Sequence, residues 1–273
     1  MDRMNFSVLL SLYHKESPIF FRESLDSVFQ QILPPAEVVL VEDGPLTPEL
    51  YEVVDIFASR HPEMKVVALK ENRGLGKALD EGLKHCSYEL VARMDTDDIC
   101  KPERFARQVA FLETHPDIDV VGAWIDEFQE NIANIISIRR VPEFPEDIRR
   151  FGKKRCPMNH PVVMFRRKAV EAVGGYRSVY LFEDYDLWVR MLLNGTKFYN
   201  LQESLLFFRF SSEMFKRRGG LKYACVETRF QWRLYKVGYT SLLITFKNIC
   251  IRFPSRIVSN GFRSWIYRTF LRK

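Results

Sequence analysis

The sequence predicts an α/β fold built on a single, mainly parallel sheet that is flanked by helices. Through the first half of the chain, short apolar runs alternate with longer segments of helical periodicity. That alternation implies right-handed crossovers and therefore parallel strands. The apolar runs are continuous, which is typical of strands buried on both faces. With 273 residues and 47% hydrophobic content, the chain is long and apolar enough to bury a large core.

Each element follows from a local pattern. Residues 6–12 form an uninterrupted apolar run and predict the first strand. Over residues 16–32 apolar side chains recur at spacings of three and four, which predicts a helix that Pro34 and Pro35 end. The next expected elements are strands at 38–41, 65–69, 90–94 and 119–125 and helices at 50–59, 74–85 and 102–114. Later in the chain we expect a strand at 162–165 and a helix that begins near Glu183.

Charge divides the chain into an acidic body and a basic tail. The net charge is +6, but residues 216–273 hold 14 Lys/Arg and one acid, or +13. The preceding residues therefore hold 27 bases and 34 acids, or −7. This asymmetry favours an anionic surface as partner of the tail and does not suggest that the body binds nucleic acid. Five scattered cysteines without a C-x-x-C pair, and no apolar export signal, predict a cytoplasmic protein with reduced thiols.

Polar residues follow three of the expected strands, where the carboxyl ends of parallel strands bind ligands. These segments are Ser11-Leu12-Tyr13-His14, Glu42-Asp43-Gly44 and Asp95-Thr96-Asp97-Asp98. No G-x-G-x-x-G follows the first strand and no P-loop motif occurs, so a dinucleotide site or a P-loop NTPase is excluded. A nucleotide held through carboxylates and a metal ion fits the pattern.

The third segment places Asp95, Asp97 and Asp98 within four positions. Carboxylates this close raise one another's pKa values and repel. Mg²⁺ or Mn²⁺ offsets that repulsion, because both prefer carboxylate oxygen and keep coordination positions open for phosphates. The alternative is an acidic turn before the helix that contains Pro102 and Glu103, since carboxylates favour helix N-termini.

A series of motifs in order resembles glycosyltransferase family 2. The motifs are S-V-L-L-S-L-Y, V-E-D-G-P, E-N-R-G-L-G-K-A-L, M-D-T-D-D, N-H-P-V-V-M-F-R-R and E-D-Y-D-L-W-V-R-M. The family comprises inverting, metal-dependent sugar-nucleotide transferases with a GT-A fold, and the likeness covers residues 4–215. The segment E-M-F-K-R-R-G-G resembles a bacterial polysaccharide-assembly branch. Ser11, His14, Glu42 and Pro45 depart from the usual family residues.

The resemblance implies a GT-A domain at 1–215, with a nucleotide-binding half at about 1–125 and an acceptor half at about 126–215, followed by a basic helical tail at 216–273. It implies that Asp43 accepts a hydrogen bond from the uracil N–H, although a turn Asp before glycine is the alternative. Tyr13 would pack against the base unless it is a core or rim residue. Ser11, Glu16 and Thr96 would also line the nucleotide-sugar site.

Residues 72–77 read N-R-G-L-G-K, a helix entry at which Asn72 and Lys77 would favour an anion, with solvated surface charge as the alternative. The family pattern makes Asp97 the direct ligand of Mn²⁺ or Mg²⁺. Asp95 would contact ribose, or the metal through water. Asp98 would orient the loop or assist the metal. The ion would offset charge on the departing nucleoside diphosphate.

The same resemblance makes Asp184 the base that removes the acceptor hydroxyl proton, with Glu183 as the substitute. Helix capping is the structural alternative for these acids. Asn159 and His160 would lie beside the acceptor, or His160 is a loop residue satisfied by its neighbours. No histidine follows position 160, so a metal-binding histidine beyond the E-D motif is absent.

The tail carries an aromatic stripe. Phe262, Trp265, Ile266 and Phe270 share a helical face, and Arg263, Arg268 and Arg272 flank it. This pattern is typical of a helix in a membrane interface, and packing on the catalytic domain is the alternative. Lys247 and Arg252 interrupt the best candidate for a membrane span, which needs about 18 uncharged apolar residues.

We therefore expect a hexosyltransferase that uses a nucleotide-diphosphate sugar, which the resemblance implies is UDP-linked. Its acceptor would be a lipid-linked oligosaccharide of bacterial surface polysaccharide synthesis, such as O-antigen or exopolysaccharide. We expect peripheral attachment to the inner face of the cell membrane and no nucleic-acid partner. A nucleotide-sugar-binding protein without turnover is one alternative, which an intact Asp184 disfavours. A nucleotidyltransferase is another, although its Gly-rich, basic first loop is missing after Leu12.

Overall fold

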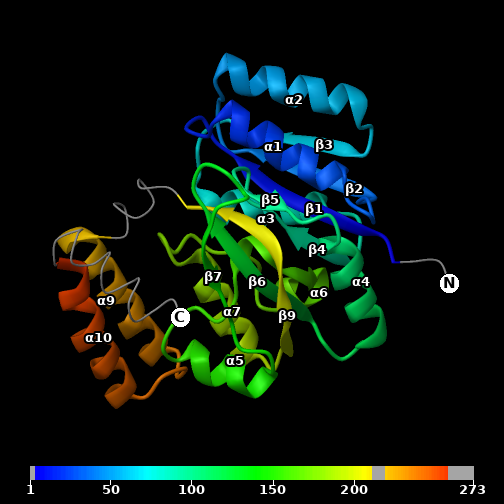
Figure 1. Ribbon diagram of the computed structural model, residues 1–273. Coiled ribbons are helices and arrows are strands. Elements are labelled where there is room, and N and C mark those ends of the chain that lie inside the picture. Colours follow the sequence, from blue (N-terminus) through cyan, green and yellow to red (C-terminus); the bar gives the residue numbers. More distant parts are fainter. Residues whose placement is uncertain (1–3, 211–218, 258–273) are drawn as a thin grey trace.

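A computed structural model describes residues 4–210 and 219–257 (Figure 1). The strands are β1 (Phe6–Leu12), β2 (Glu37–Glu42), β3 (Met64–Ala68), β4 (Leu90–Arg93), β5 (Ile99–Cys100), β6 (Val120–Phe128), β7 (Ile135–Arg139), β8 (Met164–Arg166) and β9 (Phe198–Arg209). The helices are α1 (Pro18–Phe29), α2 (Pro48–Arg60), α3 (Leu75–His85), α4 (Arg104–Thr114), α5 (Pro145–Gly152), α6 (Arg167–Glu171), α7 (Glu183–Leu193), α9 (Gly220–Lys236) and α10 (Leu242–Ile257), with a 3-10 turn, η1, at His160–Val162.

One sheet with the order β3-β2-β1-β4-β8-β6-β9-β5 runs through the molecule, and β7 pairs with β6. The first four strands along this order are parallel, as the strand–helix alternation predicted. The second half is mixed, because β8 runs antiparallel to β4 and β6 whereas β9 runs parallel to β6. β5 follows β4 after a short loop, yet it pairs with β9 at the far end, so the sheet curls back on itself.

The sheet separates two hydrophobic cores. Val8, Leu10 and Leu12 of β1 pack with α1, α2 and α4, whereas Leu9 packs with α3 and α7 on the other side. Alternate residues of a strand point to opposite faces, so a continuous apolar run is what a strand between two helical layers requires. The runs identified in the sequence therefore supply both cores.

Local caps fix where the helices begin. Predicted for residues 16–32, α1 instead begins at Pro18, because the Ser17 side chain caps it and accepts from the backbone N–H of Phe20. Thr47 caps α2 in the same way, with Pro48 as the first helical residue. In both helices proline occupies a position whose N–H needs no partner within the helix.

Helices α9 and α10 cover the described part of the basic segment and pack against each other and on the α/β body (Figure 1). The ring of Phe230 stacks on Phe182 at 4.4 Å, and Asn248 Nδ2 donates to Lys153 O at 2.9 Å. Packing on the domain is thus the arrangement of residues 219–257, and a boundary at 215/216 stays a prediction. The stripe of Phe262, Trp265, Ile266 and Phe270 lies outside the described residues. Among those described, no helix has the length and apolarity to cross a bilayer.

Candidate active site

The acidic loop joins β4 to β5 at the carboxyl edge of the parallel strands. The backbone N–H of Met94 donates to Leu9 O at 3.1 Å, which aligns the start of the loop with β1. Ser24 Oγ on α1 donates to Asp95 O at 2.9 Å and fixes the first acid. The three predicted polar segments do follow neighbouring parallel strands, β2, β1 and β4, so they lie at one edge of the sheet.

Electrostatics distinguish the acids of this loop. Burial, followed by the charge of Asp95, raises the pKa of Asp97 to about 6. Burial and the charges of Asp97 and Asp95 raise the pKa of Asp98 well above its usual range. Asp98 is fully buried, and its Oδ1 accepts from the backbone N–H of Arg209 at 2.9 Å. Of the two roles open to Asp98, these contacts favour orientation of the loop against β9.

Sequence reasoning missed two arginines that hold this loop. Arg93 is completely buried, and its Nη2 lies 2.6 Å from Asp95 Oδ1. Its Nε and Nη1 have no hydrogen-bond partner among the described residues. Arg209 Nε donates to Asp97 O at 2.9 Å, and its Nη2 contacts Glu23 Oε2 at 2.5 Å. An arginine inside the apolar run V-A-R-M was the available signal for Arg93.

Asp43 ties the end of β2 to the loop before α3. Its Oδ1 accepts from the backbone N–H of Arg73 at 2.6 Å, and its Oδ2 accepts from that of Gly74 at 3.0 Å. Asn72 Nδ2 donates to Asp43 O at 3.1 Å. Gly44 has φ +85°, and a Cβ there would lie 2.5 Å from the backbone nitrogen of Asn72. The turn and the loop therefore touch through backbone atoms, and each Asp43 oxygen keeps a lone pair for a ligand.

The other expected nucleotide-site residues border the same edge. Ser11 in β1 and Tyr13 just after it are partly exposed, and the Tyr13 ring meets His14 edge-on at 5.8 Å. The backbone N–H of Glu16 donates to Tyr13 O at 3.1 Å, which shapes the turn into α1. Thr96 is buried, and Lys77 is exposed in the first turn of α3.

Helix α7 begins with the second acidic cluster. Glu183 and Asp184 are partly exposed in its first turn, and burial raises the pKa of Glu183 to about 7. Leu181, just before the helix, has φ 66°, the one positive value for a non-glycine residue in the described ranges. Strained backbone of this kind is concentrated at functional sites. A Cβ on Gly76 would lie 2.5 Å from Arg177 O and 3.0 Å from Glu183 Cγ, so α3 closely approaches the start of α7.

The acids of α7 have different partners. Asp186 is buried between two arginines, accepting from Arg190 Nε at 2.8 Å and from Arg233 Nε at 2.7 Å. It therefore anchors α9. Cys156 Sγ lies 3.5 Å from Asp184 Oδ2, and Asp184, like Glu183, combines partial exposure with a place at the helix start.

Asn159 and His160 face the interior. Asn159 Nδ2 donates to Ala123 O at 2.9 Å, and His160 Nε2 lies 3.0 Å from the hydroxyl of Tyr176. Burial, and then the charge of Arg93, lower the pKa of His160 well below its usual range, so the ring is neutral. These contacts support the alternative of a histidine satisfied by its neighbours. Burial is the main cause that raises the pKa of Tyr176 above its usual range.

The fit of a divalent metal rests on the acidic loop. No group of three His, Cys, Asp or Glu side chains gathers as a ligand set anywhere in 4–210 or 219–257. The loop instead offers two nearby carboxylates, Asp95 and Asp97, and burial, followed by the charge of Asp95, raises the pKa of Asp97 to about 6. Mg²⁺ is commonly held by one or two carboxylates together with substrate phosphates and water. The donor set fits that mode.

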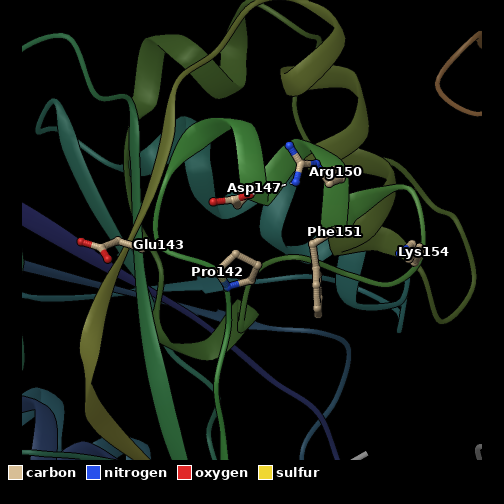
Figure 2. A pocket seen from close by; sticks show the side chains of 6 residues that line it. All are labelled: Pro142, Glu143, Asp147, Arg150, Phe151 and Lys154. Carbon is tan, nitrogen blue, oxygen red and sulfur yellow. Dashed lines mark ion pairs between the residues drawn. The ribbon is translucent and has the colours of Figure 1, made fainter.

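A separate depression of about 330 Å³ lies beside α5 (Figure 2). Figure 2 shows its lining residues on α5 and on the segments just before and after it, namely Pro142, Glu143, Asp147, Arg150, Phe151 and Lys154. Asp147 and Arg150 form an ion pair at 3.7 Å, and neither acidic cluster contributes to the lining. The depression is therefore distinct from the candidate active site.

Comparisons with known proteins identify the family. The family model described as "Glycosyl transferase family 2" matches residues 7–174. The chain belongs to glycosyltransferase family 2. A relative from Haemophilus influenzae, described as an uncharacterized glycosyltransferase, is 44% identical over 99% of this chain and 100% of its own. The UDP-Gal:alpha-D-GlcNAc-diphosphoundecaprenol beta-1,3-galactosyltransferase of Escherichia coli is 39% identical over 100% of this chain and 98% of its own.

Solved structures confirm the GT-A fold of this family 2 chain. The mannosyltransferase PcManGT from Pyrobaculum calidifontis, described in complex with GDP-Man and Mn²⁺, superposes with a TM-score of 0.68 over 98% of this chain and 76% of its own, at 17% identity. Membership of family 2 and the fold, both expected from the motifs, are therefore confirmed.

Proposed function

We propose that this chain is an inverting hexosyltransferase that moves a sugar from a UDP-linked donor to a hydroxyl of a lipid-linked glycan in bacterial surface polysaccharide synthesis. The observation that carries the proposal is the close approach of α3 to both acidic sites. The backbone N–H of Gly74 donates to Asp43 at the sheet edge that also carries the acidic loop after β4, and Gly76 lies against Glu183 in the acidic cluster at the start of α7. One cluster suits phosphates and a metal ion, and the other suits a base.

We assign separate roles to the residues at the carboxyl edge of the parallel strands. Asp43, Ser11, Tyr13, Glu16, Asn72, Lys77 and Thr96 are proposed to hold the nucleotide sugar. Asp97 and Asp95 would hold Mn²⁺ or Mg²⁺, which, when bound, supplies Lewis-acid stabilisation of the departing diphosphate. Asp98 orients their loop. The nucleotide-binding half is proposed at about 1–125 and the acceptor half at about 126–215.

Asp184 is the proposed general base. It accepts the proton of the acceptor hydroxyl as that oxygen bonds to the anomeric carbon and the bond from this carbon to the phosphate oxygen breaks. Attack from the face opposite the leaving group inverts the anomeric configuration. Glu183 is the proposed substitute, because it lies in the same first turn of α7 and burial raises its pKa to about 7, a range that suits a general base.

The acceptor is proposed from the 39% identical relative, whose name specifies a diphosphoundecaprenol substrate, and from the +13 charge of residues 216–273. A lipid-linked acceptor requires the enzyme at a membrane surface. The basic segment would bind anionic lipid from the cytoplasmic side, with the protein attached peripherally to the inner face.

The test is a panel of sugar nucleotides incubated with Mn²⁺, with Mg²⁺ or with EDTA, in the presence of a diphosphate-linked GlcNAc lipid. We expect transfer from one UDP-sugar that depends on the metal. Donor binding without transfer or hydrolysis across the panel would favour a nucleotide-sugar-binding protein instead. Release of pyrophosphate from a nucleoside triphosphate would favour a nucleotidyltransferase.

A further inference from the structure

Helix α10 presents apolar side chains outward and polar side chains inward, the reverse of a usual surface helix. Thr245 and Asn248 on the inward face are buried. Leu243, Phe246 and Ile251 are 78%, 62% and 62% exposed. We call the outward set of Leu243, Phe246, Cys250, Ile251 and Ile257 the α10 apolar face. Its members recur at helical spacing, so they form one stripe rather than scattered exposed residues.

Specific contacts fix this orientation. Glu227 on α9 is buried and accepts from Arg252 Nη1 at 2.7 Å and from Arg256 Nε at 2.8 Å. Asn248 Nδ2 donates to Gln231 Oε1 at 2.9 Å. Turning α10 to bury its apolar stripe would break these contacts and leave Glu227 as an unpaired buried charge, which is strongly unfavourable. The apolar face is therefore held in solvent by the polar face behind it.

We propose that the α10 apolar face inserts into the interfacial region of an anionic lipid bilayer. The proposal deepens the proposed function, because it rests on a lipid-linked acceptor and names the surface that meets the lipid. Within residues 219–257 the only acid is the buried Glu227, and the exposed charged residues are all cationic, namely Lys222, Arg229, Lys236 and Lys247. A bilayer with anionic headgroups complements both features of this surface, the apolar stripe and the cations.

A second copy of the chain fits this surface less well than a bilayer does, because the cations of the two copies would lie close together and repel one another. Trp232 and Tyr235 on the adjoining α9 are each 40% exposed. Both residue types favour the headgroup level of membranes. Lys247 can extend its charged end to the headgroups while its stem stays beside the apolar face.

Contacts between α9 and α7 connect this surface to the chemistry. Arg233 on α9 donates to Asp186 at 2.7 Å, and Phe230 stacks on Phe182 immediately before α7. A bilayer that holds α10 would therefore also hold the helix that carries Asp184 at a defined height. A hydroxyl on a sugar attached to a membrane lipid would then meet Asp184 without an extended search.

The test compares two triple variants of the full chain for binding to vesicles of phosphatidylglycerol and phosphatidylcholine. Leu243→Gln, Phe246→Gln and Ile251→Gln together change the α10 apolar face. Ile32→Gln, Ile132→Gln and Ile136→Gln form the matched control, at positions that are 67%, 43% and 49% exposed on other elements. We expect the first variant to bind about tenfold more weakly or worse, and the control to bind as the unmodified chain. Equal binding by both variants, or no binding by the unmodified chain, would overturn the proposal.

Neither donor nor acceptor is present in this assay, so its failure would leave the proposed transfer reaction untouched, and the sugar-nucleotide panel judges that reaction separately. Thermal denaturation of both variants confirms folding, because all six positions are exposed.

Cys250 gives a second measurement, since it is exposed on the α10 apolar face. In a Cys225→Ser background, a water-soluble maleimide should label Cys250 rapidly, and anionic vesicles should slow labelling by about tenfold or more. Protection without vesicles at every protein concentration would mean that the chain's own residues cover the face. Protection that rises with protein concentration would mean that a second copy covers it. Either result would overturn the proposal.

Discussion

Carboxyl groups of both acidic clusters carry raised pKa values, and burial is the main cause in each. Asp97 rises to about 6 with a further contribution from the charge of Asp95, and Glu183 rises to about 7. A buried carboxylate is costly unless a positive group compensates it. For Asp97 a metal ion is the proposed compensation, and Arg93 and Arg209 supply part of it in the protein itself. Replacing Asp97, Asp184 or Glu183 should therefore have a different effect on stability and on activity in each case.

Replacing Asp97 should abolish transfer while the fold remains. We expect Asp97→Ala to be inactive, and the metal-free melting temperature of Asp97→Asn to equal or exceed that of the unmodified protein, because one repelling charge is lost. Mn²⁺ should raise the melting temperature of the unmodified protein and not that of Asp97→Asn. An equal Mn²⁺ shift in both proteins, or full activity in excess EDTA, would contradict the metal role.

Asp184→Asn should remove turnover and keep donor binding. The amide has the shape of the carboxylate but does not accept a proton at neutral pH, and loss of a general base typically costs about 10²–10⁴-fold in rate. Calorimetry with UDP and Mn²⁺ measures binding, and single-turnover transfer measures the chemistry. If UDP affinity fell in step with the rate, Asp184 would be a binding residue.

Glu183 should make stability depend on pH. Its pKa rises from 4.5 unfolded to about 7 folded, so the folded state holds the proton more tightly. Stability should fall as pH rises from about 4.5 to 7 and stay lower above 7. Glu183→Gln removes this penalty, at most about 3 kcal/mol, so its melting temperature should exceed that of the unmodified protein by more at pH 8 than at pH 5. A constant difference across this range would show that the carboxyl titrates normally.

At the scale of elements, the α9–α10 pair depends on one buried acid. Burial alone would raise the pKa of Glu227, but Arg256 and Arg252 outweigh it and hold the pKa below its usual value. Glu227→Gln should destabilise the protein by about 3–5 kcal/mol, because two arginines lose their buried partner. Glu203→Gln breaks an exposed pair with Arg107 at 2.9 Å and should cost less than about 1 kcal/mol.

Urea denaturation measures both variants, and similar losses in the two would show that the buried pair contributes no more than a surface one. Glu227 should make stability depend on pH in the direction opposite to that of Glu183. A depressed carboxyl pKa stabilises the fold above the unfolded value of 4.5 and loses that contribution as pH falls below it. The difference between the unmodified protein and Glu227→Gln should therefore narrow in acid.

At the scale of the whole molecule, the −7 body and the +13 segment should make lipid binding depend on salt. Each basic residue near an anionic surface contributes about 1 kcal/mol and is screened within about 10 Å at 0.1 M salt. We expect vesicle binding of the full chain to weaken sharply between low and high salt. A chain that ends at Asn260 should bind more weakly, because it lacks four of the basic residues. Indifference to salt and to the truncation would mean that the tail does not dock on anionic lipid.

The sequence by itself determined the family, the fold and the elements of the first half. Strands β1 to β4 and helices α1 to α3 are local features, since each depends on its own periodicity and caps. The site motifs were also legible, because Asp95, Asp97 and Asp184 lie at fixed places relative to a strand end or a helix start. Roles for these residues stay predictions.

Only the tertiary structure decided which neighbours those residues have. Arg209 reaches the acidic loop from the end of β9, 112 residues away in sequence, and no local pattern reports such a contact. Arg93 is only two residues from Asp95, but its complete burial beside that acid depends on the packing around β4. The same holds for α10, where Arg252 looked like a charge that interrupts an apolar run. Its guanidinium turns inward to Glu227, so the apolar residues are the ones left facing solvent. The partner of a buried charge depends on which residues tertiary packing brings close, so it is fixed only when the helices pack.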